Sequence, residues 1–241
     1  FVTADADAHT AIERSLPDLP SNIRFVDTTH DSQLDAIRTV LSAVNNNGTF
    51  DPPPEPAHRD KLYRSLIPVD GGQRLVRRGG PNHGRPLVLL HGGMGTSALI
   101  AGRAAAFAAS RPVLALDIAG NGDSDPLSQA GANVEAFADD VLTVLTACGV
   151  DDFDLYGESS GATLAAAVAQ RAGQHVGKII LDRPEFPGDG IRTDLIANIA
   201  PPIEATWDGT HFLTAWHMLR DAALFWPWYN RTKGGVIQRD A

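Results

Sequence analysis

The stretch DLYGESSGATLAAA, residues 154–167, places a serine between two glycines, directly after an apolar run and directly before small helix-forming residues. Gly157, Ser159 and Gly161 form a G-x-S-x-G pattern at this strand-to-helix turn. A turn this tight leaves no room for side chains beside the serine, and it exposes the serine hydroxyl at the end of the strand. Because a helix N-terminus favours negative charge, the pattern predicts a nucleophilic serine whose oxyanion would be stabilised.

The regions around this turn alternate between strand and helix patterns. Four short and nearly all-apolar runs are typical of strands buried on both faces, at residues 86–91, 112–118, 153–157 and 178–182. An amphipathic helix pattern at residues 134–148 lies between two of these runs. Such alternation predicts an α/β fold, in which a mostly parallel sheet has helices on both faces.

We predict three parts along the chain. Residues 1–60 form an N-terminal arm and linker, which contains an amphipathic helix at 31–45 and a segment at 45–56 rich in asparagine and proline. Residues 61–189 form the α/β core, which opens with a β-hairpin. Residues 190–241 form a helical cap segment. The strand pattern stops at the end of the core, which indicates that the C-terminal strands of such a sheet are absent from this chain.

A glycine-rich loop, His91-Gly-Gly-Met-Gly95, follows the first core strand. Its backbone can turn an N–H group toward the serine, and the N–H group of Ser160 can supply a second donor. Two such donors form an oxyanion hole, and the loss of one typically costs about 3 kcal/mol of transition-state stabilisation. Gly93 is the first candidate for the loop donor and Met94 is the second. Met94 is also predicted to contact the substrate.

The motifs HGGMG, DIAGNGDS and GESSG follow three successive predicted strands in this order, and together they resemble the α/β-hydrolase superfamily over about residues 62–240. The resemblance implies that Ser159 is the nucleophile and that the backbone of Gly93 and Ser160 forms the oxyanion hole. It implies a structural role for Asp117. The family also includes haloalkane dehalogenases and epoxide hydrolases with aspartate at the elbow, and the serine argues against those two chemistries.

The chemistry that remains is acyl transfer. Because GESSG is close to the GESAG of carboxylesterases, we expect a serine hydrolase that cleaves a small, largely apolar carboxylic ester through an acyl-enzyme on Ser159. A thioesterase or acyltransferase, amide or C–C bond cleavage, and a non-catalytic ligand-binding relative of the same fold remain open. We expect neither a cofactor nor a metal ion.

Two further sets of residues are predicted to serve this site. Asp182 ends the strand run KIILD, where its carboxylate can orient a histidine; pairing with Arg183 or capping of the next segment is the alternative. Aromatic residues crowd positions 225–229, where Trp226 and Trp228 are predicted to wall an apolar pocket over the serine. Packing of the cap segment onto the core is the alternative use for aromatic residues in this segment.

The histidine that must activate Ser159 is missing from its expected place. The resemblance puts this base after the last strand of the sheet, but no such strand is recognisable after Asp182, and none of the eight histidines matches that position. We therefore predict a heterodimer, in which a second polypeptide completes the sheet and supplies the catalytic histidine. A chain trimmed by processing fits the start at Phe1; truncation or a disordered tail is the alternative.

The composition argues against several other partners. The formal net charge is −9 with no basic patch, which argues against nucleic acid as a partner. Cys148 is the single cysteine, so neither an internal disulfide nor a multi-cysteine metal site can form. No apolar run approaches the roughly 20 residues that span a bilayer, and the first residues lack the order of a signal peptide. We therefore expect a cytoplasmic protein that does not bind membranes.

Overall fold

The computed structural model divides the chain into two compact units, Phe1–Glu185 and Phe186–Ala241. The structure describes residues 62–128, 133–184 and 203–226, together with the short pieces 2–3, 26–27, 193–194, 197–198, 229 and 236–237. The helix predicted at residues 31–45 and the linker predicted at 45–56 lie outside the described residues.

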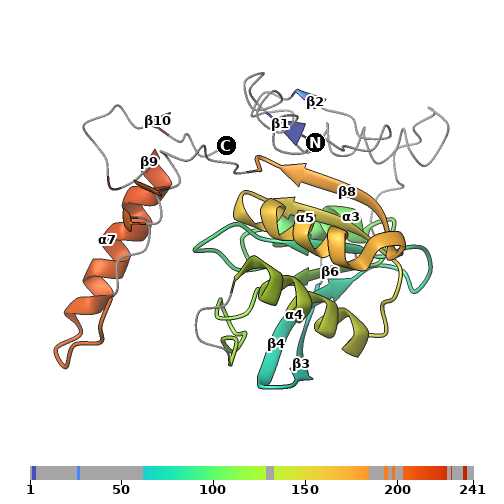
Figure 1. Cartoon of the computed structure of the whole chain (residues 1–241), viewed down its shortest axis with the longest axis horizontal. Coiled ribbons are helices and arrows are strands. Elements are labelled where there is room, and N and C mark those ends of the chain that lie inside the picture. The colour runs from blue at the N-terminus through green and yellow to red at the C-terminus, as the bar shows by residue number, and fades with distance from the viewer. Residues whose placement is uncertain are drawn as a thin grey trace. The chain divides into compact units, whose positions relative to one another are not determined.

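Unit 1 is built on an eight-stranded sheet with the strand order β2-β1-β8-β7-β5-β6-β4-β3 (Figure 1). The strand β4 runs antiparallel to its neighbours β3 and β6, and every other pair in the sheet is parallel. The strands are β1 (Val2–Thr3), β2 (Val26–Asp27), β3 (Tyr63–Val69), β4 (Gly72–Gly79), β5 (Leu87–Leu90), β6 (Val113–Leu116), β7 (Phe153–Glu158) and β8 (Val176–Asp182). The predicted fold class, a mostly parallel sheet in an α/β fold, is confirmed.

Helix α3 (Ala101–Ala108) covers one face of this sheet. Ala104 and Phe107 of the helix belong to a buried cluster that includes Leu89, Tyr156 and Ile180. These three strand residues are register neighbours on β5, β7 and β8. The helix therefore closes the middle of the sheet, and β5 and β7 are apolar along their length because both of their faces are covered.

Helices α4 (Val134–Ala147) and α5 (Ser160–Ala172) pack against each other and cover the opposite face (Figure 1). Asn133 caps the start of α4, since its side chain accepts a hydrogen bond from the N–H group of Ala136 at 3.0 Å. The buried guanidinium of Arg74 on β4 binds both carboxylate oxygens of Asp140 on α4. A short 3₁₀ helix, η2 (Gly173–His175), connects α5 to β8.

The N-terminal strands β1 and β2 extend the sheet beyond β8. Val2 lies opposite Asp182 of β8, and Val26 lies opposite Val2. Two strands from the predicted arm, residues 1–60, are therefore part of the core sheet. The sequence pattern predicts that this part of the chain is an arm on the core, but it gives no sign that two of its segments join the sheet.

Unit 2 contains helix α7 (Thr210–Leu224) and a separate antiparallel pair, β9 (Phe225–Trp226) and β10 (Val236–Ile237). Within the described residues that follow Asp182, no strand joins the eight-stranded sheet, which agrees with the predicted absence of C-terminal strands. The side chain of Trp226 and the whole of Trp228 lie outside the described residues. None of the helices that the structure describes is long and apolar enough to cross a bilayer.

Candidate active site

Ser159 stands between β7 and α5 in a strained backbone conformation, with φ 53° and ψ −124°. A residue with a side chain rarely adopts such angles, which cost about 1–3 kcal/mol and persist only where the surroundings impose them. Here the Ser159 N–H group donates to the carbonyl of Asp182 at 2.9 Å, and the Ser159 carbonyl accepts from the N–H group of Ala162 at 2.9 Å. The end of β8 and the first turn of α5 thus hold the serine in this conformation.

The two glycines of the motif are required by close backbone contacts. A Cβ atom on Gly157 would lie 2.3 Å from the carbonyl oxygen of Gly161, and one on Gly161 would lie 2.3 Å from the carbonyl oxygen of His91. Neither position can hold a side chain without moving the backbone. Gly161 therefore allows α5 to lie directly against the end of β5, which brings the loop after β5 next to the serine.

The loop His91–Gly95 contacts the residues predicted to act with it. A Cβ atom on Gly92 would lie 3.2 Å from Cβ of Ser159, and one on Gly93 would lie 3.2 Å from Oγ of Ser160. Because α5 begins at Ser160, its first N–H groups have no acceptor inside the helix. The structure therefore brings together Ser159, Gly93 and Ser160, and their roles as nucleophile and oxyanion hole stay predictions.

Met94, the second candidate donor, has a positive φ of 57° and a side chain that is 41% exposed. A left-handed conformation is unusual for methionine and marks the loop as a second strained position beside the serine. Leu99, a few residues further on, is 77% exposed. These two side chains put apolar surface on this loop and the segment that follows it.

His91 is buried, and both of its ring nitrogens are bonded to backbone groups. Its Nδ1 atom donates to the carbonyl of Gly92 at 2.8 Å, and its Nε2 atom accepts from the N–H group of Ile118 at 3.0 Å. Burial lowers the pKa of this imidazole, so it is neutral at pH 7. His91 therefore fixes the loop beside Ser159 and is not available as its general base.

Asp117 performs a similar task for the neighbouring loop. One of its carboxylate oxygens accepts from the N–H group of Ser97 at 2.7 Å, and the other accepts from the N–H group of Asp123 at 3.0 Å. A Cβ atom on Gly122 would collide with this carboxylate at 2.1 Å. The carboxylate therefore ties together the two loops that follow β5 and β6, as a structural residue does.

The carboxylate of Asp182, the predicted acid, is fully buried and accepts a hydrogen bond from the hydroxyl of Tyr156 at 2.5 Å. The Nε atom of Arg183 lies 3.6 Å from it. Burial raises the pKa of this carboxyl group. Its backbone carbonyl also holds Ser159, so Asp182 has a structural part in the elbow, and its part as the orienting acid stays a prediction.

A cluster of charges directly before the serine is not predicted by the sequence patterns. Glu158 forms ion pairs with Arg103 of α3 and with Arg183. The guanidinium of Arg103 also lies over the ring of Tyr156, 5.7 Å from its centroid. No sequence pattern links these residues, since Glu158 ends β7, Arg103 lies in α3 and Arg183 follows β8. The only signal is a charged residue placed immediately before the predicted nucleophile.

The histidines in the described part of unit 1 are His83, His91 and His175, and none is placed to activate Ser159. His83 lies in the turn before β5, and His175 lies just before β8, where it pairs with Asp152 at 3.2 Å. Both therefore lie at the amino edge of the parallel strands, whereas Ser159 follows the carboxyl end of β7. His211 and His217 belong to unit 2, where Nδ1 of His211 accepts from the N–H group of Thr206.

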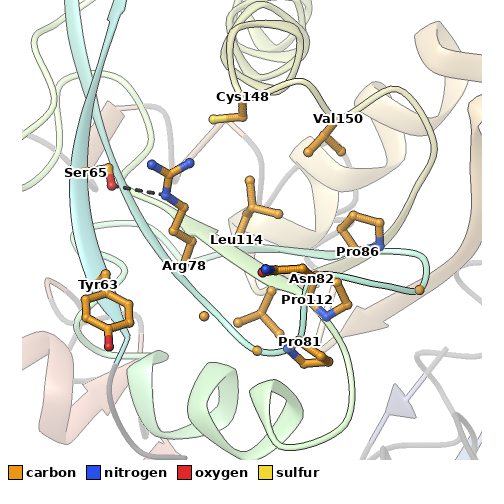
Figure 2. Close-up of a pocket in the computed structure, with 14 residues that line it drawn as sticks. Tyr63, Ser65, Arg78, Pro81, Asn82, Pro86, Pro112, Leu114, Cys148 and Val150 are labelled. Carbon is orange, nitrogen blue, oxygen red and sulfur yellow. Dashed lines mark hydrogen bonds between the residues drawn. The ribbon is translucent and has the colours of Figure 1, made fainter.

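A cavity of about 650 Å³ lies at the amino edge of the strands (Figure 2). Pro86 and Pro112, which precede β5 and β6, line it together with Arg78, Leu114 and Cys148. None of the predicted catalytic residues lines this cavity, so it is separate from the serine. Burial raises the pKa of the Cys148 thiol, which disfavours the reactive thiolate. The described residues contain no cluster of histidine, cysteine and acidic side chains that could hold a metal ion.

Comparisons with known proteins agree with this architecture. The sequence profile of the α/β hydrolase fold matches residues 85–207. A proline iminopeptidase from Heyndrickxia coagulans is 32% identical over 124 residues, which are 49% of this chain and 42% of that protein. Naproxen esterase (carboxylesterase NP) from Bacillus subtilis superposes with a TM-score of 0.52 at 22% identity, over 65% of this chain and 54% of the esterase.

Carboxylesterase CesB from Bacillus subtilis superposes with a TM-score of 0.50 at 24% identity, over 58% of this chain and 50% of that protein. At such identities the structural likeness concerns the fold alone. The chain spans 42% of the iminopeptidase and 54% and 50% of the two esterases, about half the length of each relative.

Proposed function

The chain belongs to the α/β hydrolase fold family, and we propose that it is a serine hydrolase that cleaves a small, largely apolar carboxylic ester through an acyl-enzyme on Ser159. The observation that carries the proposal is the backbone of Ser159, with φ 53° and ψ −124° at the start of α5. Strain of this kind is concentrated at reactive residues, where it fixes the direction of the side chain. Gly93 and Ser160 beside it supply N–H groups of the kind that an oxyanion needs.

The proposed reaction has two halves. In the first, Oγ of Ser159 attacks the ester carbonyl while a general base takes its proton, and the N–H groups of Gly93 and Ser160 stabilise the oxyanion. The base returns the proton to the leaving alkoxide, which departs as an alcohol and leaves the acyl-enzyme. In the second half, water attacks the acyl-enzyme, its proton passes through the base to Oγ of Ser159, and a carboxylic acid is released.

An apolar acyl or alcohol group fits the apolar surface near the serine. Met94 and Leu99 are both exposed at the loop after β5 and in the segment that follows it. Trp226 and Trp228 remain proposed contributors to an apolar pocket. A thioester substrate, or transfer of the acyl group to an acceptor other than water, would use the same nucleophile and remains an alternative.

Amide cleavage is a second candidate, and one observation favours it. The relative with 32% identity is a proline iminopeptidase, and the aligned segment is half of this chain. Amides and esters pass through tetrahedral intermediates of the same kind, so the nucleophile and oxyanion hole proposed here serve both. The two activities can differ only in which substrate the protein recognises. The direct comparison is the turnover of a chromogenic proline anilide with the turnover of a short-chain aryl ester.

Labelling with a fluorophosphonate probe tests the nucleophile. We expect stoichiometric labelling of Ser159 and a burst of alcohol from the aryl ester, with both lost in Ser159→Ala. Ser110→Ala is the matched control, because Ser110 is an exposed serine after α3 and should label and turn over like the wild type. Ligand binding without labelling of the wild type would instead identify a non-catalytic member of the family, and turnover equal in Ser159→Ala would remove Ser159 from the mechanism.

A further inference from the structure

We propose that the cavity at the amino edge of the strands is a binding site for a small organic carboxylate with an apolar body, and that Arg78 binds the carboxylate group. Neither Ser159 nor any other residue predicted to act in catalysis lines this cavity. The inference therefore goes beyond the proposed function and does not depend on it.

The register of the sheet places Arg78 in a row of three side chains on one face. Tyr63 of β3 lies opposite Arg78 of β4, and Arg78 lies opposite Leu114 of β6. Paired residues on neighbouring strands point to the same face of a sheet, so the three side chains share that face. All three line the cavity of about 650 Å³ (Figure 2). The sheet side of the cavity therefore carries a phenol, a guanidinium and a buried apolar side chain in this order.

Arg74 shows what a second arginine on this face of β4 binds. It lies four residues before Arg78, and its guanidinium binds the two carboxylate oxygens of Asp140 on α4, at 2.8 and 2.9 Å. Four residues of a strand span about 13 Å, and the eight residues of helix from Asp140 to Cys148 span about 12 Å. The position beside Arg78 is therefore the end of α4, where the neutral Cys148 stands in place of a carboxylate.

The guanidinium of Arg78 uses only part of its hydrogen-bonding capacity within the described residues. Its Nε atom donates to Oγ of Ser65 at 3.1 Å, which fixes the orientation of the group. Figure 2 shows the group extending toward Cys148. In the part of the chain that the structure describes, neither terminal nitrogen has an acceptor, and none of the residues lining the cavity is acidic. The two terminal N–H groups form an edge that matches the two oxygens of a carboxylate.

The end of α4 does not need Arg78 as a cap. The carbonyl of Leu145 accepts from the N–H group of Val150 at 2.9 Å. The carbonyl of Thr146 accepts from the N–H group of Gly149 at 3.0 Å. An arginine near a helix C-terminus can bond to such carbonyls, but here backbone groups already satisfy them. Among the described residues this leaves Arg78 available to the carboxylate of a ligand.

Prolines and closely packed backbone build the walls of the cavity. Pro86 and Pro112 precede β5 and β6, and the N–H group of Leu87 donates to the carbonyl of Pro112 at 2.9 Å. A Cβ atom on Gly80 would lie 2.2 Å from the carbonyl oxygen of Arg111, so the turn after β4 packs directly against the segment before β6. Small-molecule sites typically enclose about 300–1,000 Å³ and combine apolar walls with a few polar groups. The cavity therefore suits a carboxylate attached to an aromatic or aliphatic group.

Protection of Cys148 from alkylation tests the site, because Cys148 lines the cavity and is the only cysteine of the chain. The probe is phenylacetate, and 2-phenylethanol is its neutral analogue of similar size. Mass spectrometry of the intact protein follows modification by iodoacetamide at constant ionic strength and about pH 8.5, where a thiol is partly ionised. We expect phenylacetate to slow the modification about tenfold once its concentration reaches about ten times Kd, and 2-phenylethanol to have little effect.

Arg78→Gln removes the proposed anchor, and Arg64→Gln is the matched control. Arg64 lies on β3 opposite Arg77, so its side chain stands on the other face of the sheet, where it pairs with Asp123. Both arginines are exposed, so both variants should keep the thermal midpoint of the wild type. We expect protection to persist in Arg64→Gln and to be lost in Arg78→Gln.

Each protein is compared with itself in the absence of ligand. Burial raises the pKa of the Cys148 thiol and the charge of Arg78 offsets part of that rise, so Arg78→Gln also changes the basal rate of modification. The ratio of the rates with and without phenylacetate is therefore the quantity that reports binding.

Three results would overturn the proposal. The first is no protection of the wild type at up to about 50 mM phenylacetate, since a ligand of this size is expected to bind with a Kd of about 1 mM. The second is protection that persists in Arg78→Gln, and the third is equal protection by 2-phenylethanol. Because none of these measurements uses Ser159, a failure of the proposed function would leave them unchanged.

Discussion

At the scale of single residues, the candidate site is held together by side chains that take no part in the proposed reaction. His91 binds the carbonyl of Gly92 on one side and the N–H group of Ile118 on the other, so it couples the loop after β5 to the loop after β6. This coupling helps to hold the glycine loop beside Ser159 in place. A buried neutral imidazole with both nitrogens bonded is therefore a positioning group, and its protonation is a way to disturb the loop.

This bonding predicts a particular pH dependence of stability. Burial holds the pKa of His91 below its usual 6.5 in the folded protein, whereas the unfolded chain regains about 6.5. Between these two values the unfolded state binds more protons, so the free energy of unfolding falls as the pH is lowered through about 6.5. In His91→Gln the amide oxygen can still accept from Ile118, but it does not titrate. We expect urea unfolding at pH 7.5 and pH 5.5 to show a smaller loss of stability in the variant; equal losses in both proteins would contradict the prediction.

At the scale of elements, the site depends on how closely α5 approaches the end of β5. Gly161 permits this approach, since a Cβ atom there would lie 2.3 Å from the carbonyl oxygen of His91 and 2.5 Å from that of Leu90. Backbone atoms cannot move aside as the end of a flexible side chain can. The first turn of α5 carries Ser160 and the N–H groups proposed for the oxyanion, so any shift of the helix start moves those groups away from the loop after β5.

Gly161→Ala should therefore lower both stability and reactivity. We expect a loss of about 1–3 kcal/mol in the free energy of unfolding, as for other overpacked sites, and slower labelling of Ser159 by the fluorophosphonate probe. Gly102→Ala is the matched control, because Gly102 lies in α3 and a Cβ atom added there would have no heavy atom within 4 Å. That variant should gain about 0.5 kcal/mol and label at the wild-type rate. If Gly161→Ala were as stable and as reactive as the wild type, the start of α5 would not lie as close to the end of β5 as it does in the structure.

How far the sequence predicts this architecture differs between elements. The strands at residues 86–91, 112–118, 153–157 and 178–182 are predictable because continuous apolar runs are visible locally, and β5, β6, β7 and β8 correspond to them. The strands β1 and β2 are only two residues long, and the place of β1 beside β8 depends on pairing with a residue far away in the sequence. A strand of two residues is too short to show an alternating pattern, so this pairing has no local signature.

In the candidate site too, residues of local motifs are predictable, and contacts between distant elements are not. Ser159, Gly93 and Ser160 come from local motifs, and the structure brings them together. The ion pairs of Glu158 with Arg103 and Arg183 join separate elements and could not be predicted. No local motif identifies the base, and none of the histidines in the described part of unit 1 lies where it could activate Ser159.

At the scale of the whole molecule, unit 2 carries apolar surface that nothing in its described part covers. On α7, Phe212 is 70% exposed and Trp216 is 63% exposed, and Leu219 continues the same helical stripe. An exposed apolar patch of this kind commonly marks a binding surface. Such a stripe can bind an apolar group of another molecule.

Trp216→Ser tests whether this stripe binds the apolar part of an ester. Because the indole is largely exposed, its loss should leave the thermal midpoint of the protein unchanged. If the stripe binds the apolar part of the ester in the ground state and the transition state alike, the substitution should raise KM several-fold with kcat preserved. Thr214→Ala is the matched control, since Thr214 is an exposed residue on the opposite side of α7 and should leave both constants unchanged. The measurement is steady-state kinetics with esters of increasing acyl length. The effect of Trp216→Ser on KM should grow with the length of the acyl chain. A KM that equals the wild-type value for every ester would show that the stripe does not bind the substrate.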